Sequence, residues 1–361
     1  MWNLAKDTIS HSDIEALADW LGTYPQLTQG DMVRRFEEAW SEWLGVSGSV
    51  LMSSGTTANF ALMAVVEQRL KRKPRVGVAA VTWPTNVTPS ILLGHELVVF
   101  DVDRRTLGVN EEQVCAAMRR REIDILFVTH LLGLNALTDQ IIETARDKGV
   151  ILLEDCCEAH GAYHGNQKVG TFGLGSTFSF YFGHHMSTIE GGMVSTNDPG
   201  LADELRRFRA HGQPAPGVFS FVSAGLNFRS TEINAFLGLR QLKRLDQRIE
   251  QRNRNMETFL SGIPSWLWSD FRTEGMSSFA LPLIAKSTTG AVIVKRVVER
   301  LGIESRPVVA GNIMRQPFMR DYQTHPMWVA DEIHDRGIYV GNGPHVNLSM
   351  VEALTGELTD P

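Results

Sequence analysis

The sequence predicts an α/β protein with a large domain built on a mixed, mostly parallel sheet and a smaller α+β domain after it. In the first half, short runs rich in β-branched residues alternate with longer segments of helical pattern, as in parallel strands joined by helices. The chain has 361 residues, whereas one domain usually contains ~150. With 43% apolar residues it can bury a sizeable core. These observations favour two domains.

Five strands are expected in the first half, and two more on either side of a turn within 177–194. Because ligands of parallel sheets bind at the carboxyl ends of the strands, we expect the functional residues to follow them. The first five strands are expected at 49–52, 75–81, 96–101, 123–130 and 149–154.

A long polar helix is expected at 230–259 and would bridge to the second domain, with leucines at its apolar positions. This places the two domains at 1–245 and 246–361. The second domain is expected to contain a strand at 278–284, a helix at 290–301 and a strand beginning within 302–307.

Charge and hydropathy exclude several classes of protein. The net charge of −6 gives no electrostatic reason to bind nucleic acid or an acidic membrane surface. No apolar run approaches the ~18 residues needed to cross a bilayer, and the first residues lack the apolar core of a signal peptide. We therefore expect a soluble, cytoplasmic protein with neither nucleic acid nor a membrane as partner.

The three cysteines are Cys115, Cys156 and Cys157. Two adjacent thiols suit neither an ordinary disulfide framework nor a four-thiolate iron–sulfur cluster. We expect all three to be reduced thiols.

A segment rich in Ser, Thr and Gly at 53–59 follows the first expected strand and opens a helix. The backbone amides and hydroxyl groups of Ser54, Gly55 and Thr56 form a candidate phosphate site at the positive end of that helix. A glycine turn with ordinary Ser/Thr capping accounts for the same residues. The segment alone leaves both interpretations open.

Trp83 is the second residue after the expected strand 75–81. An indole at such a position can stack flat on a heteroaromatic ring. Viewed in isolation, a tryptophan packed in the core is the commoner explanation.

Two carboxylates follow the expected strand 149–154. A buried carboxylate needs a partner, and a protonated pyridine nitrogen would give Asp155 one while making that ring an electron sink. Glu158 lies three residues further on. Helix capping or a structural ion pair is the alternative for each of them.

Two adjacent histidines lie in the turn within 177–194, before a Glu-Gly-Gly segment at 190–192. Imidazole exchanges a proton near neutral pH, so His184 is a candidate acid–base residue. A histidine pair can also indicate a metal, but neighbouring side chains on an extended segment diverge and no third ligand is evident. We therefore predict no metal site. The glycines allow a tight turn.

Eight segments, taken in order from about residue 30 to 345, resemble the DegT/DnrJ/EryC1/StrS sugar aminotransferase family. They read SSGTTAN, TWPTN, LLEDCCEAHGA, GTFGLGSTFSFYFGHHMSTIEGGMV, RAHG, GLNFR, GIESRPVVAGN and GIYVGN. The resemblance implies the fold of aspartate aminotransferase, called fold type I. It also implies the cofactor pyridoxal 5'-phosphate, or its amine form pyridoxamine 5'-phosphate, and a homodimer with shared active sites.

The resemblance assigns a role to each site residue. The cofactor would be bound by Ser54, Gly55, Thr56, Trp83, Asp155, Glu158 and Ser179, together with Asn227 of the neighbouring subunit. Substrate would be bound by His211, Glu304 and Arg306. An arginine fork at 306 could hold a sugar hydroxyl or the carboxylate of an amino-acid donor, and a surface ion pair between Glu304 and Arg306 is the alternative.

His184 stands where the family has the lysine that binds the cofactor covalently, a bond that imidazole cannot form. The resemblance is therefore strongest to the histidine-bearing sugar 3-dehydratases of deoxysugar biosynthesis, such as the colitose pathway. It implies removal of the C3 hydroxyl of a nucleotide-linked 4-keto-6-deoxy sugar, with GDP-4-keto-6-deoxy-D-mannose as the expected substrate. L-glutamate would restore the amine form of the cofactor, and ammonia would be released.

Two alternatives stay open, a nucleotide-sugar 4-aminotransferase and a catalytically inactive, cofactor-binding regulator. The chain also departs from the family pattern in two places. Gly183 stands where a hydroxyl residue is expected before the histidine, and the segment between Gly212 and Gly225 is short. Both departures concern the recognition of the sugar.

Overall fold

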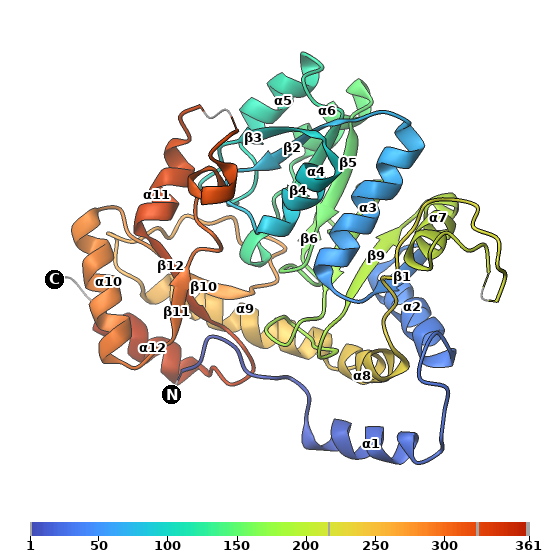
Figure 1. Ribbon diagram of the computed structural model, residues 1–361. Coiled ribbons are helices and arrows are strands. Elements are labelled where there is room, and N and C mark those ends of the chain that lie inside the picture. Colours follow the sequence, from blue (N-terminus) through green and yellow to red (C-terminus); the bar gives the residue numbers. More distant parts are fainter. Residues whose placement is uncertain (1, 216, 323–324, 359–361) are drawn as a thin grey trace.

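The computed structural model describes residues 2–215, 217–322 and 325–358. Its centre is a seven-stranded sheet in the order β1-β9-β8-β5-β4-β2-β3 (Figure 1). All of these strands are parallel to one another except β9, which runs the opposite way. The strands are β1 (Gly48–Met52), β2 (Arg75–Ala79), β3 (Glu96–Phe100), β4 (Ile125–Thr129), β5 (Ile151–Asp155), β8 (Gly175–Ser179) and β9 (Gly192–Thr196). The mixed, mostly parallel sheet is confirmed.

Helices cover both faces of this sheet, because successive strand residues point into different cores. Val50 and Val194 pack in the core that contains α3 (Gly55–Leu70). Leu51 and Met193 pack in the core that contains α2 (Asp31–Leu44). Strands buried on both faces are apolar throughout, which explains the apolar runs in the sequence. The other helices of this part are α1 (His11–Leu21), α4 (Thr88–Leu93), α5 (Glu111–Arg119), α6 (Asp139–Lys148), α7 (Pro199–Arg209) and α8 (Glu232–Leu242), and β6 (Tyr163–His164) pairs with β7 (Gln167–Lys168).

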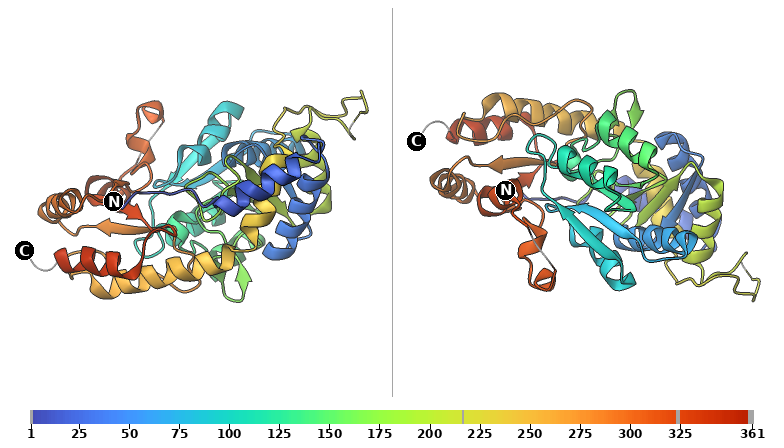
Figure 2. Two further views of the ribbon diagram at one scale, coloured as in Figure 1. Left: turned by 90° about the horizontal axis from the view of Figure 1, so that it is seen from below. Right: turned by 90° about the horizontal axis from the view of Figure 1, so that it is seen from above.

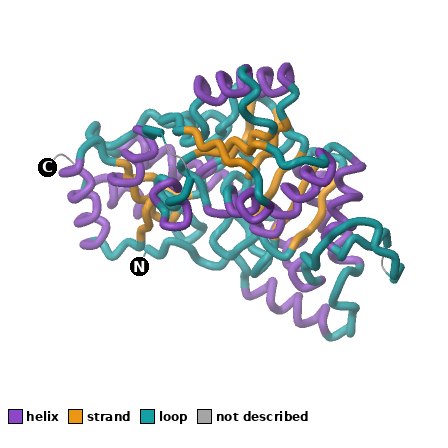
Figure 3. Tube along the Cα trace, turned by 45° about the horizontal axis from the view of Figure 1, so that its top comes forward, coloured by secondary structure: helices purple, strands orange, loops and turns teal. Residues whose placement is uncertain are grey.

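A second, antiparallel sheet has the order β10-β12-β11. Figure 3 shows the strands in two groups, and Figure 2 shows the C-terminal elements gathered at one end of the molecule with the N-terminus. Trp2 bridges Ile303, and its indole N–H donates to Gly341 O at 2.8 Å. The first residues of the chain thus pack on the second domain, although our proposed division counts them with 1–245. The elements here are β10 (Ala280–Ile284), α10 (Thr288–Arg300), β11 (Ser305–Pro307), α11 (Trp328–Arg336), β12 (Gly337–Gly341) and α12 (Leu348–Glu357).

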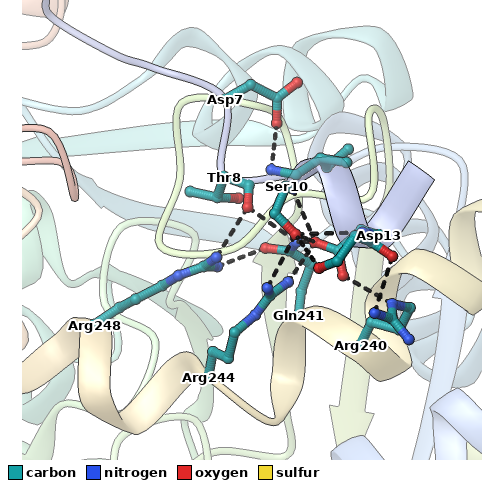
Figure 4. A network of polar contacts seen from close by, with 10 residues as sticks. Asp7, Thr8, Ser10, Asp13, Arg240, Gln241, Arg244 and Arg248 are labelled. Carbon is teal, nitrogen blue, oxygen red and sulfur yellow. Dashed lines mark hydrogen bonds and ion pairs between the residues drawn. The ribbon is translucent and has the colours of Figure 1, made fainter. Parts of the chain in front are cut away.

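The helix expected at 230–259 is wrong as a single element, since it is divided into α8 and α9 (Leu245–Gly262). The chain leaves helical geometry at Arg244, where φ is −113° and ψ is 1°. The guanidinium of Arg244 bonds to the buried carboxylate of Asp13, which also accepts hydrogen bonds from Arg240 and Gln241 (Figure 4). No Gly or Pro marks this break, so the helical pattern continues across it. A tertiary contact overrides local propensity there.

Among the described helices, none combines the length and apolar character that a membrane crossing requires.

Candidate active site

A cavity of about 410 Å³ opens at the edge where the parallel strands of the large sheet end. Residues at or just after the carboxyl ends of five of these strands line it, namely Ser54, Trp83, Thr129, Asp155 and Ser179. Parallel strands end at one edge, so residues far apart in sequence meet there. Leu4 of the N-terminal segment and residues of the second domain complete the walls.

Asp155, the last residue of β5, presents its carboxylate to the cavity wall and is 4% exposed. The amide groups of Asn59 and Asn86 each donate a 2.8 Å hydrogen bond to Oδ2. The backbone N–H of Cys157 donates to Oδ1 at 2.9 Å. None of these donors is a cation, so the ion-pair alternative does not hold among the described residues. The donors fix the carboxylate and leave Oδ1 able to accept one more hydrogen bond.

The N-terminus of α3 forms another wall of the cavity. The Ser54 side chain caps the helix by accepting from the Thr57 N–H at 3.1 Å. Among the described residues, nothing accepts from the backbone N–H groups of Gly55 and Thr56, and both residues line the cavity. A Cβ atom on Gly55 would lie 2.7 Å from Ser179 Cβ, so only glycine allows this close approach. The capping and phosphate interpretations are therefore compatible.

Trp83 and Glu158 contribute an aromatic surface and an acid. Trp83 is 52% exposed and lines the cavity, so the core-tryptophan alternative does not hold.

The Leu132 N–H donates to Glu158 Oε2 at 2.8 Å. Burial raises the pKa of Glu158 to about 7. The protonated form of its carboxyl group is therefore well populated near neutral pH and can donate a hydrogen bond to a ligand oxygen.

The turn between β8 and β9 carries His184 into the cavity wall. The Phe180 N–H donates to Gly191 O at 2.9 Å, and the His184 N–H donates to Tyr181 O at 2.9 Å. A Cβ atom on Gly192 would lie 2.2 Å from Ser54 O. Glycine is thus required where β9 passes the loop before α3. This contact holds the turn beside the N-terminus of α3.

The imidazole of His184 lines the cavity in its neutral form. Its Nδ1 has no hydrogen-bond partner among the described residues, and its ring centroid lies 5.3 Å from that of Phe279. Burial and the positive charge of Arg252 lower the pKa of His184 to about 3. The ring is therefore neutral near pH 7, and this is the form that acts as a base.

His185 points away from the cavity. It is fully buried, and its Nε2 lies 3.1 Å from both the carbonyl oxygen and the hydroxyl oxygen of Ser277. The two side chains diverge as expected, although His184 and His185 lie in a turn and not on an extended segment. Elsewhere in the described ranges, His130, Glu154 and Cys156 lie close enough together to hold a metal, but none of them lines the cavity.

Glu304 and Arg306 reach the cavity from the second domain, on and just before β11. The Leu4 N–H donates to Glu304 Oε2 at 2.9 Å, which ties the N-terminal segment to this wall. No ion pair joins Glu304 to Arg306 in the part of the chain described, so the surface ion-pair alternative does not hold. The guanidinium of Arg306 remains exposed to a ligand.

His211 and Asn227 do not lie at this cavity. Both are exposed in the segment between α7 and α8. The His211 N–H donates to Leu226 O at 3.0 Å, and Asn227 Oδ1 accepts from Arg229 Nε at 3.0 Å. Within one chain His211 does not reach the cavity, because the fold directs this segment away from it, and its substrate-binding role stays a prediction. Either residue can reach a site only in a partner subunit.

Several residues at the cavity or directly behind its wall received no role from the sequence. Asn59 and Asn86, which hold Asp155, are the last residues of the SSGTTAN and TWPTN segments, so a signal was present. Arg252 lies on α9 and Lys6 in the N-terminal segment, and both line the cavity. Neither follows a strand of the large sheet, and no local pattern marks them.

The residues present fit a flat, phosphorylated pyridine. The free N–H groups at the start of α3 and the Ser179 hydroxyl suit a phosphate. Asp155 suits a protonated ring nitrogen, Trp83 suits a ring face and protonated Glu158 suits a ring oxygen. These groups line a single cavity, and they are the donor set that the expected cofactor requires.

Comparison with known proteins gives a consistent set of relatives. Residues 8–359 match the DegT/DnrJ/EryC1/StrS aminotransferase family. The chain is 33% identical to GDP-4-keto-6-deoxy-D-mannose 3-dehydratase of Yersinia pseudotuberculosis, with 94% of this chain and 93% of that protein covered. It is 34% identical to the protein of that name from Escherichia coli O55:H7, with 94% of each covered. It is 31% identical to GDP-perosamine synthase of Caulobacter vibrioides, with 77% of this chain and 76% of that protein covered.

Solved structures agree with this set. The structure of E. coli GDP-4-keto-6-deoxy-D-mannose-3-dehydratase with bound hydrated PLP matches with a TM-score of 0.93 and 30% identity, over 99% of both chains. A structure of GDP-4-keto-6-deoxymannose-3-dehydratase with a trapped PLP-glutamate geminal diamine matches with a TM-score of 0.92 and 29% identity, over 99% of this chain and 100% of that chain. The expected fold type I is confirmed, since fold and family agree over nearly the whole chain.

Proposed function

The chain belongs to the DegT/DnrJ/EryC1/StrS aminotransferase family, and we propose that it is a pyridoxal phosphate-dependent 3-dehydratase of a nucleotide-linked 4-keto-6-deoxy sugar. GDP-4-keto-6-deoxy-D-mannose is the proposed substrate, since relatives named for that activity match 94% of the chain. L-glutamate is the proposed donor, and a related structure contains a PLP-glutamate adduct. The observation that carries the proposal is the neutral imidazole of His184 on the cavity wall, at the position where the family has its lysine.

Residues of the large domain would hold the cofactor. The phosphate would lie against the Gly55 and Thr56 N–H groups and the hydroxyls of Ser54 and Ser179. Asp155 would accept a hydrogen bond from the ring nitrogen, Trp83 would cover a ring face and Glu158 would donate to the ring oxygen. When bound, the cofactor supplies an electron sink and a carbonyl or amine group that reacts with sugar and amino acid.

His184 would carry the proton transfers. Its neutral imidazole accepts a proton during the reaction and, once protonated, donates one to the oxygen that leaves C3 of the sugar. Because histidine forms no covalent bond to the cofactor, residue 184 would leave the amine group of the cofactor available to the sugar. The net products are a 3-deoxy ketosugar, ammonia and 2-oxoglutarate.

Glu304 and Arg306 would bind the sugar or the glutamate carboxylate from the second domain. Asn227 and His211 would act on the site of a second copy, as in a homodimer with shared sites. Supporting this, the segment between α7 and α8 exposes large aromatic side chains, with Phe219 88% and Phe221 62% exposed. Exposed aromatic groups of this kind are typical of protein interfaces.

One incubation tests the proposal. The protein is mixed with pyridoxal phosphate, L-glutamate and GDP-4-keto-6-deoxy-D-mannose, and the sugar is analysed by mass spectrometry alongside an ammonia assay. We expect a product with one oxygen fewer, with ammonia and 2-oxoglutarate in equal amounts. Absence of turnover with this sugar, despite a normal spectral response to glutamate, would exclude the proposed substrate.

A 4-aminotransferase is the second candidate function, because GDP-perosamine synthases also match the chain. In that case the same incubation yields a 4-amino sugar and no ammonia. A catalytically inactive regulator would bind the cofactor and give neither product. The intact set of Asp155, Ser179, Glu190, Glu304 and Arg306 on one cavity argues against it, since an idle site has no need of them.

A further inference from the structure

Arg252 is a buried cation beside His184 that the proposed reaction does not use. It lies on α9, is 3% exposed and lines the cavity. Within the described ranges no carboxylate pairs with it. An unpaired charge is expensive to bury, so its position calls for an explanation.

The guanidinium of Arg252 joins three parts of the molecule. Nη1 donates to Phe279 O at 2.7 Å, and Nη2 donates to His184 O at 3.4 Å. Phe279 directly precedes β10, so the Arg252 side chain joins the turn that contains His184 to the second domain. The guanidinium carbon also lies 6.0 Å from the centroid of the Phe279 ring, against which the imidazole packs.

The backbone of Arg252 is held as firmly as its side chain. Asn342 Nδ2 donates to Arg252 O at 2.8 Å and to Ser278 Oγ at 2.9 Å. Asn255, one turn further along α9, donates to Asn342 Oδ1 at 2.8 Å. This network joins α9 to the residues next to β10 and β12, so it fixes the backbone from which the Arg252 side chain extends.

The groups around the imidazole add no compensating negative charge at this contact. The ring centroid of His160, from the turn after β5, lies 6.2 Å from that of His184, and the ring centroid of Tyr181, from the turn after β8, also lies at 6.2 Å. His185 is neutral at neutral pH, because burial lowers its pKa well below the usual value. Asp155, Glu158 and Glu190 line other parts of the cavity wall, as do the cations Lys6 and Arg306.

We propose that Arg252 is a positioning residue, which fixes the His184 backbone against the second domain and places a positive charge beside the His184 imidazole. The proposal rests on the proposed function, in which His184 transfers the proton. A planar guanidinium can donate to two carbonyl groups at once and stays charged, whereas lysine provides the charge without the fork. The two substitutions Arg252→Lys and Arg252→Gln therefore separate the two effects.

The charge effect is tested by titrating His184 in cofactor-loaded protein with histidine-selective nitrogen labelling, using NMR. The His184 signal is identified by its loss in His184→Asn. In Arg252→Gln we expect the imidazole pKa to rise by roughly one unit or more, whereas in Arg252→Lys it stays close to wild type. Equal imidazole titration in Arg252→Gln and wild type would overturn the charge effect.

The positioning effect is tested by the rate of the spectral change that L-glutamate produces. We expect the rate constant in Arg252→Lys to fall at least tenfold. The pH at which the rate declines on the acid side of its profile should stay as in wild type. In Arg252→Gln this decline on the acid side should move to higher pH. An unchanged rate in Arg252→Lys would overturn the positioning effect.

Arg248→Gln is the control, since Arg248 is a half-buried arginine on α9 that donates to Gln241 Oε1 and Thr8 O (Figure 4). It removes a guanidinium one turn away that touches neither His184 nor Phe279, so the His184 titration should not change. If it moved the titration as far as Arg252→Gln, general loosening of α9 would be the cause and the proposal would fail. Neither readout involves the sugar, so a wrong sugar substrate leaves this test intact.

Discussion

Asn86 Nδ2 donates a 2.8 Å hydrogen bond to Asp155 Oδ2 and so joins the loop after β2 to the end of β5. Asn59 makes an equal bond from α3 to the same oxygen. The carboxylate that we propose to meet a ring nitrogen is thereby fixed by two neutral donors from two separate elements. This arrangement leaves the negative charge of Asp155 available for the cofactor.

Substituting Asn86 by alanine should weaken cofactor binding about 10–100-fold, since hydrogen bonds to charged groups contribute about 1.5–3 kcal/mol. Titration of the apoprotein with pyridoxal phosphate, followed by absorbance, measures the change. Asn110→Ala removes an asparagine that caps α5 away from the cavity and should leave the affinity unchanged. Equal affinities in Asn86→Ala and wild type would remove Asn86 from the site.

His184→Asn should bind the cofactor normally and lose sugar dehydration by at least about 100-fold, the usual contribution of a general acid–base group. The affinity is taken from the absorbance titration and the rate from ammonia release. Turnover at the original rate would exclude His184 from proton transfer.

His184→Lys should restore a covalent bond to the cofactor aldehyde, because the side chain of residue 184 lines the same cavity as Asp155. We expect a shifted absorbance band, a cofactor-sized mass increase after borohydride reduction and little dehydratase activity. A protein that gains no mass after reduction would show that residue 184 does not face the cofactor.

Gly192→Ala should destabilise the fold by about 1–3 kcal/mol or more, as overpacking of a buried contact does, since its Cβ would lie 2.2 Å from Ser54 O. Urea unfolding measures the free energy. The control is Gly183→Ala, where the atom nearest to a new Cβ is the Cβ of Ala5, at 3.5 Å. We expect that variant to change stability by less than about 0.5 kcal/mol, and a larger loss there than in Gly192→Ala would contradict the geometry.

Glu158 should make the apoprotein lose stability as pH rises from about 4.5 to about 7. In that range the unfolded state has released the proton that buried Glu158 still holds, so the folded state binds more protons. The slope for one group is at most about 1.4 kcal/mol per pH unit. Urea unfolding at several pH values should show this slope reduced in Glu158→Gln, and an identical profile in both proteins would contradict the raised pKa.

Mixing His184→Asn with Asn227→Ala tests whether sites are shared between subunits. If Asn227 serves the partner's site, half of the mixed dimers combine the two variants and each such dimer has one intact site, giving roughly a quarter of wild-type activity. If Asn227 serves its own chain, every site is defective and no activity returns. Unmixed variants are the control.

Sequence alone determined the sheet, the family and most of the cavity wall. Apolar runs separated by helical patterns identified the five early strands, because burial on both faces leaves a local signature. The residues after those strands were predictable for the same reason, since parallel strands bring their ends to one edge. Ser54, Trp83, Asp155 and Ser179 all meet there.

Only the tertiary structure decided what depends on contacts between distant segments. The division of the expected helix 230–259 arises at Arg244, which is bonded to Asp13 more than 200 positions earlier. Other features also depend on contacts between distant segments. They are the hydrogen bond from Arg252 to His184, the partners of Asp155 and the position of His211 outside the cavity. Hydrogen-bond partners and burial set the charge and orientation of a side chain, and these are fixed only when the chain has folded.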